Sequence, residues 1–192
     1  KPIIIVAGEP NSVFLEIFFK AIKKKIKNPI ILIASYKIIK MQMKKLKFRK
    51  KIRLIDYKKI EEYLLDNKSI NLVNINYNQN KAFTKISNKS NSYINRSFNT
   101  AFKIINGGFS NKLINGPISK KYFLNNKFLG ITEYLAKKSK VKDIAMLIYN
   151  SNLSVSPVTT HLPLKHVVKK INKKLIKKKI ILVNNFYQNR FK

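Results

Sequence analysis

Two stretches of this 192-residue chain combine turn residues with side chains that can bind ligands. Residues 113–120 read LINGPISK and are followed at 130–134 by GITEY, whereas residues 154–164 read SVSPVTTHLPL. In the last stretch a β-branched run ends at His161 and turns through a proline into a helical pattern. In open α/β sheets, ligands bind beyond the carboxyl ends of strands. A neutral imidazole there can bind a divalent metal or transfer a proton near neutral pH, and a histidine that only satisfies nearby backbone groups fits the same spacing.

The polar residues around these stretches each have two interpretations. The Gly-Pro pair at 116–117 is ordinary turn chemistry, and Lys120 after it can offer an ammonium to a phosphate or simply be solvated. Thr132 can cap the start of a helix, where the helix dipole favours the carboxylate of Glu133. A helix N-terminus is also a natural site for a bound anion. For Glu9, in the loop after the first strand, we expect hydrogen bonds to backbone amides of the turn more than a position facing a ligand.

Apolar runs and helical patterns alternate through the first part of the chain. Continuous apolar runs are typical of strands buried on both faces of a parallel sheet. The order predicts an α/β fold with a parallel sheet and right-handed crossovers. The expected strands are 3–6, 29–34, 52–55, 70–75 and 112–115, and the expected helices are 13–26, 36–48 and 81–105.

The last third of the chain predicts a hairpin and an amphipathic helix. Residues 143–149 and 153–160 look like two strands joined through Asn150-Ser151-Asn152, and Pro157 restricts the second to a sheet edge or a bulge. From Leu164 to Ile176, apolar residues follow helical spacing with lysines on the other face. We favour a core-packed helix with a solvated lysine face over a helix that binds membranes or acidic partners.

Charge and composition limit the class of protein. The 41 Lys and Arg residues face only 8 Asp and Glu residues, so the net charge is +33. This excess attracts nucleic acids and small phosphorylated ligands alike. Because the lysines are spread over nearly every predicted element, we do not favour nucleic-acid binding. The sequence has no cysteine, no apolar stretch of membrane-spanning length and no signal-peptide pattern, so we expect a cytoplasmic protein.

Four motifs in order resemble one enzyme family. The runs LINGPISKKYFLNNKFLGITEYLA, DIAMLIYN and TTHLPLKHVVKKI, together with the opening IIIVAGEP, are similar to the NAD-dependent 4-hydroxythreonine-4-phosphate dehydrogenases of pyridoxal phosphate biosynthesis. TTHLPL at this distance after GxTE is a specific signal, whereas GEP alone is weak. The resemblance brackets nearly the whole chain.

The resemblance implies a homodimer whose subunits have two α/β lobes, similar in fold to isocitrate and isopropylmalate dehydrogenases. The active site would lie between the lobes and use both subunits. Residues 1–129 would form the first lobe, and residues 130–192 would begin a second lobe that is incomplete at its C-terminus. The implied reaction is metal-assisted oxidation of 4-phosphohydroxy-L-threonine by NAD, followed by decarboxylation, with Zn, Mg or Co as the divalent metal.

Carried over by position, His161 matches the first of three metal-binding histidines, and Thr132 matches the threonine of a His-Thr pair that contacts substrate. The histidine of that pair is Ile131 here, so one polar contact is missing. The family's Gly-Ile-Gly-Pro after the first loop is Ser12-Val13-Phe14-Leu15. The other two metal histidines and most cofactor contacts have no counterpart in these 192 residues, and His166 is not stacked with His161 on a helix.

Two other functions stay open at the level of sequence. A shortened relative could keep the fold as a binding or dimerising module without catalysis, and the positive charge allows a nucleic-acid-binding protein. For the dehydrogenase reading, a chain with one of three metal ligands should bind metal weakly and turn over little or nothing by itself.

Overall fold

A computed structural model describes residues 1–125 and 127–190, which divide into two compact units, 1–125 and 126–192. Residues 126, 191 and 192, which the expected lobes 1–129 and 130–192 include, lie outside the described residues. Whether the two units correspond to lobes of a larger protein stays a prediction. Each unit is therefore described separately.

The first unit is built on a five-stranded sheet in the order β3-β4-β2-β1-β5, with every neighbouring pair parallel. The α/β fold predicted from the sequence is confirmed. The strands are β1 (Ile3–Val6), β2 (Ile30–Ala34), β3 (Ile52–Leu54), β4 (Ile70–Asn74) and β5 (Leu113–Asn115).

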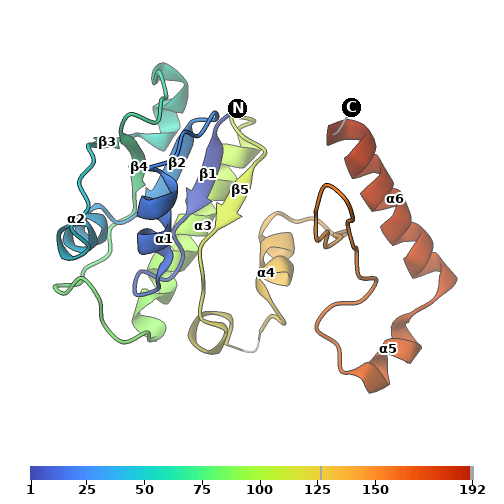
Figure 1. Cartoon of the computed structure of the whole chain (residues 1–192). Coiled ribbons are helices and arrows are strands. Elements are labelled where there is room, and N and C mark those ends of the chain that lie inside the picture. The colour runs from blue at the N-terminus through green and yellow to red at the C-terminus, as the bar shows by residue number, and fades with distance from the viewer. Residues whose placement is uncertain (126, 191–192) are drawn as a thin grey trace. The chain divides into compact units, whose positions relative to one another are not determined.

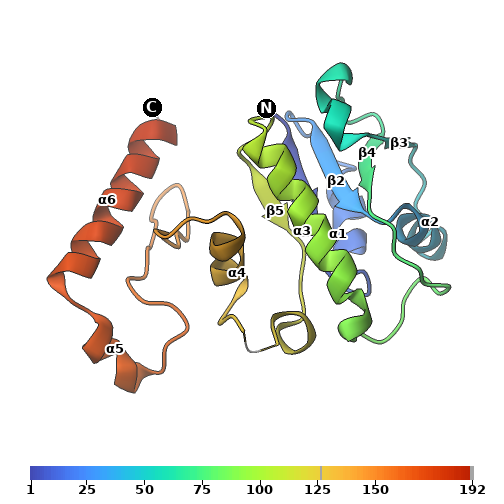
Figure 2. The same ribbon diagram turned by 180° about the vertical axis from the view of Figure 1, so that it is seen from behind.

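Helices cover both faces of this sheet (Figures 1 and 2). Helices α1 (Phe14–Ala21) and α2 (Tyr36–Lys45) lie on one face, where Phe18 and Ile39 pack with alternate strand residues such as Leu32. Helix α3 (Asn91–Asn106) crosses the other face and buries Ile94 and Phe98 there. Because apolar side chains leave both faces of β1, β2 and β4, the sheet needs both helical layers. The remaining short helices are η1 (Tyr57–Glu62), η2 (Asn88–Ser90) and η3 (Lys120–Leu124).

The predicted helix over 81–105 is too long at its start. Residues 81–87 form no helix, and α3 begins at Asn91 after the short turn η2. The reason is a tertiary contact, because the side-chain oxygen of Asn11 accepts hydrogen bonds from Gln79 Nε2 and from Thr84 N, both at 2.9 Å. These bonds hold residues 79–84 as a loop against the segment that follows β1.

The second unit contains α4 (Ile131–Lys138), α5 (Leu164–Lys170) and α6 (Lys173–Arg190). The hairpin predicted for 143–149 and 153–160 is wrong in extent, since only Ile148 and Val155 form an antiparallel bridge. The backbone of Ile148 and Val155 exchanges both hydrogen bonds, at 2.8 and 2.9 Å. No other strand of the described part of this unit lies beside the bridge to extend it.

The single helix predicted from Leu164 onward is interrupted. Ile171 is extended after α5, and the Asn172 side chain accepts a hydrogen bond from Leu175 N at 2.9 Å, which caps the start of α6. The expectation of a core-packed helix is also wrong within the described residues, because α5 and α6 bury no side chain. Leu164 is 83 % exposed and Val168 is 81 % exposed. None of the described helices is both long enough and apolar enough to span a membrane.

Candidate functional site

In the first unit, two loops meet at the carboxyl ends of the neighbouring strands β1 and β5. Gly116 N donates to Val6 O at 2.7 Å, and Glu9 N donates to Pro117 O at 2.8 Å. A Cβ built on Gly116 would lie 2.1 Å from Ala7 O, so any larger residue would force the loops apart. Gly8 is under the same constraint and also has a left-handed φ of +74°. The glycines therefore let the two backbones touch.

Glu9 is buried at this junction, with 2 % of its surface exposed. Its Oε1 accepts hydrogen bonds from Asn11 N at 3.1 Å and from Asn11 Nδ2 at 3.2 Å, and its Oε2 accepts one from Ser90 Oγ at 2.6 Å. The structural role expected for Glu9 is thus observed, with Ser90 as a partner that local sequence did not suggest. A buried carboxylate held by several donors fixes the loop in place.

Three tyrosines have raised pKa values because their own phenol groups are shielded from water. Burial raises the pKa of Tyr77 and, more strongly, that of Tyr93, and the charge of Glu9 adds to both effects. In the second unit, burial raises the pKa of Tyr134 to about 12. Losing water disfavours the phenolate more than the neutral phenol, so all three stay neutral near neutral pH.

Lys120 lies at the start of η3 in the first unit, and its side chain is exposed. It forms no ion pair within residues 1–125 and 127–190. The ammonium group of Lys120 is therefore accessible to an anion, but its position does not identify which anion it would bind.

In the second unit, the start of α4 and the turn at His161 come together around Gly130. A Cβ built on Gly130 would lie 3.1 Å from His161 Nε2 and 3.1 Å from Glu133 Oε2. His161 Nε2 and Glu133 Oε2 therefore lie within twice 3.1 Å of each other. Thr160 Oγ1 donates to Glu133 Oε1 at 3.4 Å, whereas Glu133 Oε2 is buried without a hydrogen-bond partner among the described residues.

His161 itself is exposed and has a left-handed φ of 56°. Non-glycine residues rarely adopt this conformation, and such strain is concentrated at functional sites. Thr132 does not cap α4, because the N-cap is Gly130, two residues earlier, and the helix begins at Ile131. Glu133 does lie in the first turn, where the helix dipole favours a carboxylate.

The structure thus brings His161, Thr160 and Glu133 together at Gly130. Ile131 and Thr132 lie on the first turn of α4 in the same unit, and Lys120 belongs to the other unit. Sequence reasoning gave Glu133 only a helix-dipole role and Thr160 no role of its own. The signal for both was their place in GITE and TTH, next to residues already chosen. Within the described residues, no group of three His, Cys, Asp or Glu side chains could hold a metal ion.

Comparison with known proteins decides the family. The family model described as "Pyridoxal phosphate biosynthetic protein PdxA" matches residues 25–192. The chain belongs to the PdxA family. The chain is 31 % identical over 195 residues to 4-hydroxythreonine-4-phosphate dehydrogenase of Wigglesworthia glossinidia brevipalpis, an alignment that covers 99 % of this chain and 58 % of that protein. It is 32 % identical over 197 residues to the enzyme of the same name from Sulfurihydrogenibium sp. (strain YO3AOP1), with coverage of 97 % and 58 %.

Solved structures with the same enzyme name share the fold of this PdxA chain. The 4-hydroxythreonine-4-phosphate dehydrogenase of Klebsiella pneumoniae aligns with a TM-score of 0.86 at 20 % identity, over 98 % of this chain and 58 % of the other. The enzyme from Burkholderia phymatum aligns with a TM-score of 0.80 at 21 % identity, over 93 % and 56 %. This PdxA chain therefore spans a little under three-fifths of the relatives that it matches.

Proposed function

We propose that this chain is part of an NAD-dependent dehydrogenase that oxidises the secondary alcohol of 4-phosphohydroxy-L-threonine. The alcohol carbon would give a hydride to NAD, the hydroxyl would lose its proton, and the resulting β-keto acid would lose carbon dioxide. Membership of the PdxA family and the names of the relatives support this proposal. The observation that carries it is the match of residues 25–192 to the PdxA family, and the place of the exposed His161 ring beside Gly130 at the start of α4 supports it.

His161 would hold a divalent cation through its imidazole. The donors present fit one corner of such a site, because an exposed ring lies near a carboxylate oxygen that is buried without a partner. The other ligands would come from elsewhere in the whole protein or from a second subunit of a homodimer. When bound, a divalent metal polarises the reacting hydroxyl and stabilises negative charge that develops on its oxygen.

The remaining roles follow from residue chemistry. Thr132, on the first turn of α4, would bind substrate through its hydroxyl, while Ile131 has no polar group to replace the family histidine at its position. Lys120 would attract the substrate phosphate as a point charge. The net charge of +33 favours a phosphorylated substrate and a dinucleotide in the same way. The family assignment does not favour nucleic-acid binding.

The test compares His161→Ala with His166→Ala, since these are the two histidines of the chain. Zinc should shift the NMR signals of the His161 ring and leave those of His166 unchanged. In the whole protein, His161→Ala should abolish metal binding and NAD reduction with the fold intact, whereas His166→Ala should alter neither. Equal turnover in the two variants would remove His161 from the mechanism.

Ile131→His tests the substrate pocket separately. If the pocket otherwise matches the family, the added imidazole should lower KM for 4-phosphohydroxy-L-threonine by about tenfold, the effect of one good polar contact. The matched control is Leu129→His, which adds the same ring at an exposed position nearby. An unchanged KM in Ile131→His would mean that the contact is made by another residue.

A further inference from the structure

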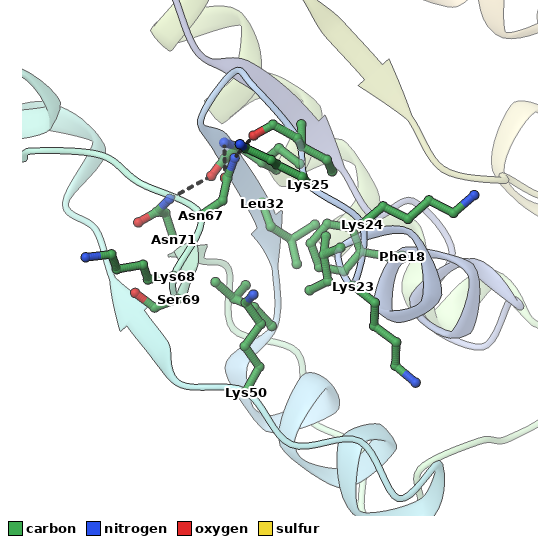
Figure 3. Close-up of a pocket in the computed structure, with 14 residues that line it drawn as sticks. Phe18, Lys23, Lys24, Lys25, Leu32, Lys50, Asn67, Lys68, Ser69 and Asn71 are labelled. Carbon is green, nitrogen blue, oxygen red and sulfur yellow. Dashed lines mark hydrogen bonds between the residues drawn. The ribbon is translucent and has the colours of Figure 1, made fainter.

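The first unit contains a cavity at the end of the sheet where the strands begin. It has a volume of about 400 Å³ and lies between the C-terminal end of α1, the first residues of β2 and β4, and the loops that precede these strands (Figure 3). Because the strands are parallel, this end of the sheet is opposite to the end where Gly8 and Gly116 meet. The cavity is therefore separate from the loops that follow β1 and β5.

The floor of the cavity is apolar and belongs to the core of the unit. The residues that line it here are buried, with at most 8 % of their surface exposed: Phe18, Ile30, Leu32 and Ile70. A cavity of this size, with an apolar floor and polar groups around it, is comparable with the sites that bind small organic molecules.

The rim of the cavity is cationic. Lys23 and Lys24 stand on one side and Lys68 on the other, with Lys50 between them and Lys25 above (Figure 3). No lining residue is acidic, and none of the five lysines forms an ion pair within the part of the chain that the structure describes. Lys50 is half-buried, unlike the other four. Several unpaired ammonium groups above a low-dielectric floor attract an anion strongly.

Two asparagines hold the cavity walls in place. Asn67 Nδ2 donates to Ile26 O at 3.0 Å and to Asn28 O at 2.9 Å, while its Oδ1 accepts from Ile30 N at 3.0 Å. Asn71, which is 1 % exposed, donates to Ile30 O at 2.9 Å. These bonds join the loop before β2 to the segment that begins β4. The cavity is thus formed before any ligand arrives, which reduces the entropic cost of binding.

We propose that this cavity binds a small phosphate monoester with a compact apolar or aromatic body. The body would lie against Phe18 and Leu32, and the phosphate would face Lys50 and Lys68. A phosphate dianion suits several lysines because each acts as a point charge and does not require the planar geometry of arginine. This site is independent of the proposed dehydrogenase reaction.

Phenyl phosphate is the probe, titrated into the 192-residue chain and followed by backbone amide NMR signals. It should bind about tenfold more tightly than inorganic phosphate, because the ring buries apolar surface that the inorganic ion lacks. Phenol should bind more weakly than phenyl phosphate, and the largest signal changes should occur at Leu32, Ser69 and Ile70. Equal affinity for phenyl phosphate and inorganic phosphate would overturn the proposal.

Two double variants with the same loss of charge separate the cavity from general lysine binding. Lys50→Gln with Lys68→Gln should weaken phenyl phosphate binding by about fivefold or more. Lys51→Gln with Lys58→Gln, at exposed positions that do not line the cavity, should leave the affinity nearly unchanged. Equal weakening in both pairs would refute a specific site. Ser69→Trp, which places a ring in the cavity, should block the probe while the remaining amide signals confirm the fold.

Discussion

Ser90 Oγ donates a hydrogen bond of 2.6 Å to Glu9 Oε2 and so connects the turn before α3 to the loop after β1. Both residues are almost fully buried, with exposed fractions of 1 % and 2 %. Together with the two hydrogen bonds that Asn11 donates to Glu9, this bond explains why the carboxylate can be buried there.

Ser90→Ala should destabilise the first unit by about 1–3 kcal/mol, because a buried carboxylate oxygen then loses its donor. Urea unfolding measures the change. Ser92→Ala, at an exposed position of α3, is the matched control and should have almost no effect. Equal midpoints for the two variants would contradict the structural role of the Glu9 contact.

Gly116→Ala should be more damaging than Gly107→Ala. A Cβ at Gly116 would lie 2.1 Å from Ala7 O, whereas one at Gly107 would lie 3.4 Å from its nearest neighbour, Lys103 O. Separating the β1 and β5 loops should cost about 3 kcal/mol or more. Thermal unfolding followed by circular dichroism gives the comparison, and similar melting temperatures would show that the loops move apart easily.

Gly130→Ala should disturb His161 without unfolding α4. The added Cβ would approach His161 Nε2 and Glu133 Oε2 to 3.1 Å, which side chains can relieve by small movements. We expect a stability loss of about 1 kcal/mol or less, the usual difference between Gly and Ala at an N-cap. The ring signals of His161 should shift in NMR spectra while those of His166 do not. Unshifted His161 signals would mean that the ring does not lie beside Gly130.

The stability of the second unit should fall between pH 10 and about pH 12. Burial raises the pKa of Tyr134 from 10.0 to about 12, so in this window the unfolded chain releases a proton that the folded chain keeps. Its contribution is fully present below pH 10 and is lost as the pH rises through the folded pKa. Tyr134→Phe should remove this part of the decrease, and Tyr149→Phe, at an exposed tyrosine, should not. Parallel pH profiles for all three proteins would argue against the burial of Tyr134.

The sheet was predictable because strands that are buried on both faces of a parallel sheet read as short, continuous apolar runs. The run Ile3–Val6 forms β1 with the predicted bounds, and the run that starts at Pro29 in the prediction forms β2 from Ile30. The start of α3 was not predictable in this way. It depends on bonds from Gln79 and Thr84 to Asn11, which is distant in sequence.

The candidate site shows the same limit. His161 was identified from its place after a β-branched run and from the resemblance, and the structure adds that its backbone is left-handed and its ring lies near Gly130. The unpartnered oxygen of Glu133 depends on three-dimensional packing that no local pattern encodes. The failed hairpin and the uncovered α5 and α6 were mispredicted because periodicity indicates which face is apolar but not whether anything covers it.

The order of the strands determines when the first unit can fold during synthesis. β1 is made first, yet its outer neighbour is β5, so Ile4 and Ile5 pair with Leu113 and Ile114 only after almost the whole unit has left the ribosome. Until then one side of the first strand has unpaired backbone groups, and pairings between distant segments form slowly. A chain that stops before residue 113 should therefore expose the edge of β1 and aggregate more readily than one that includes residues 113–115.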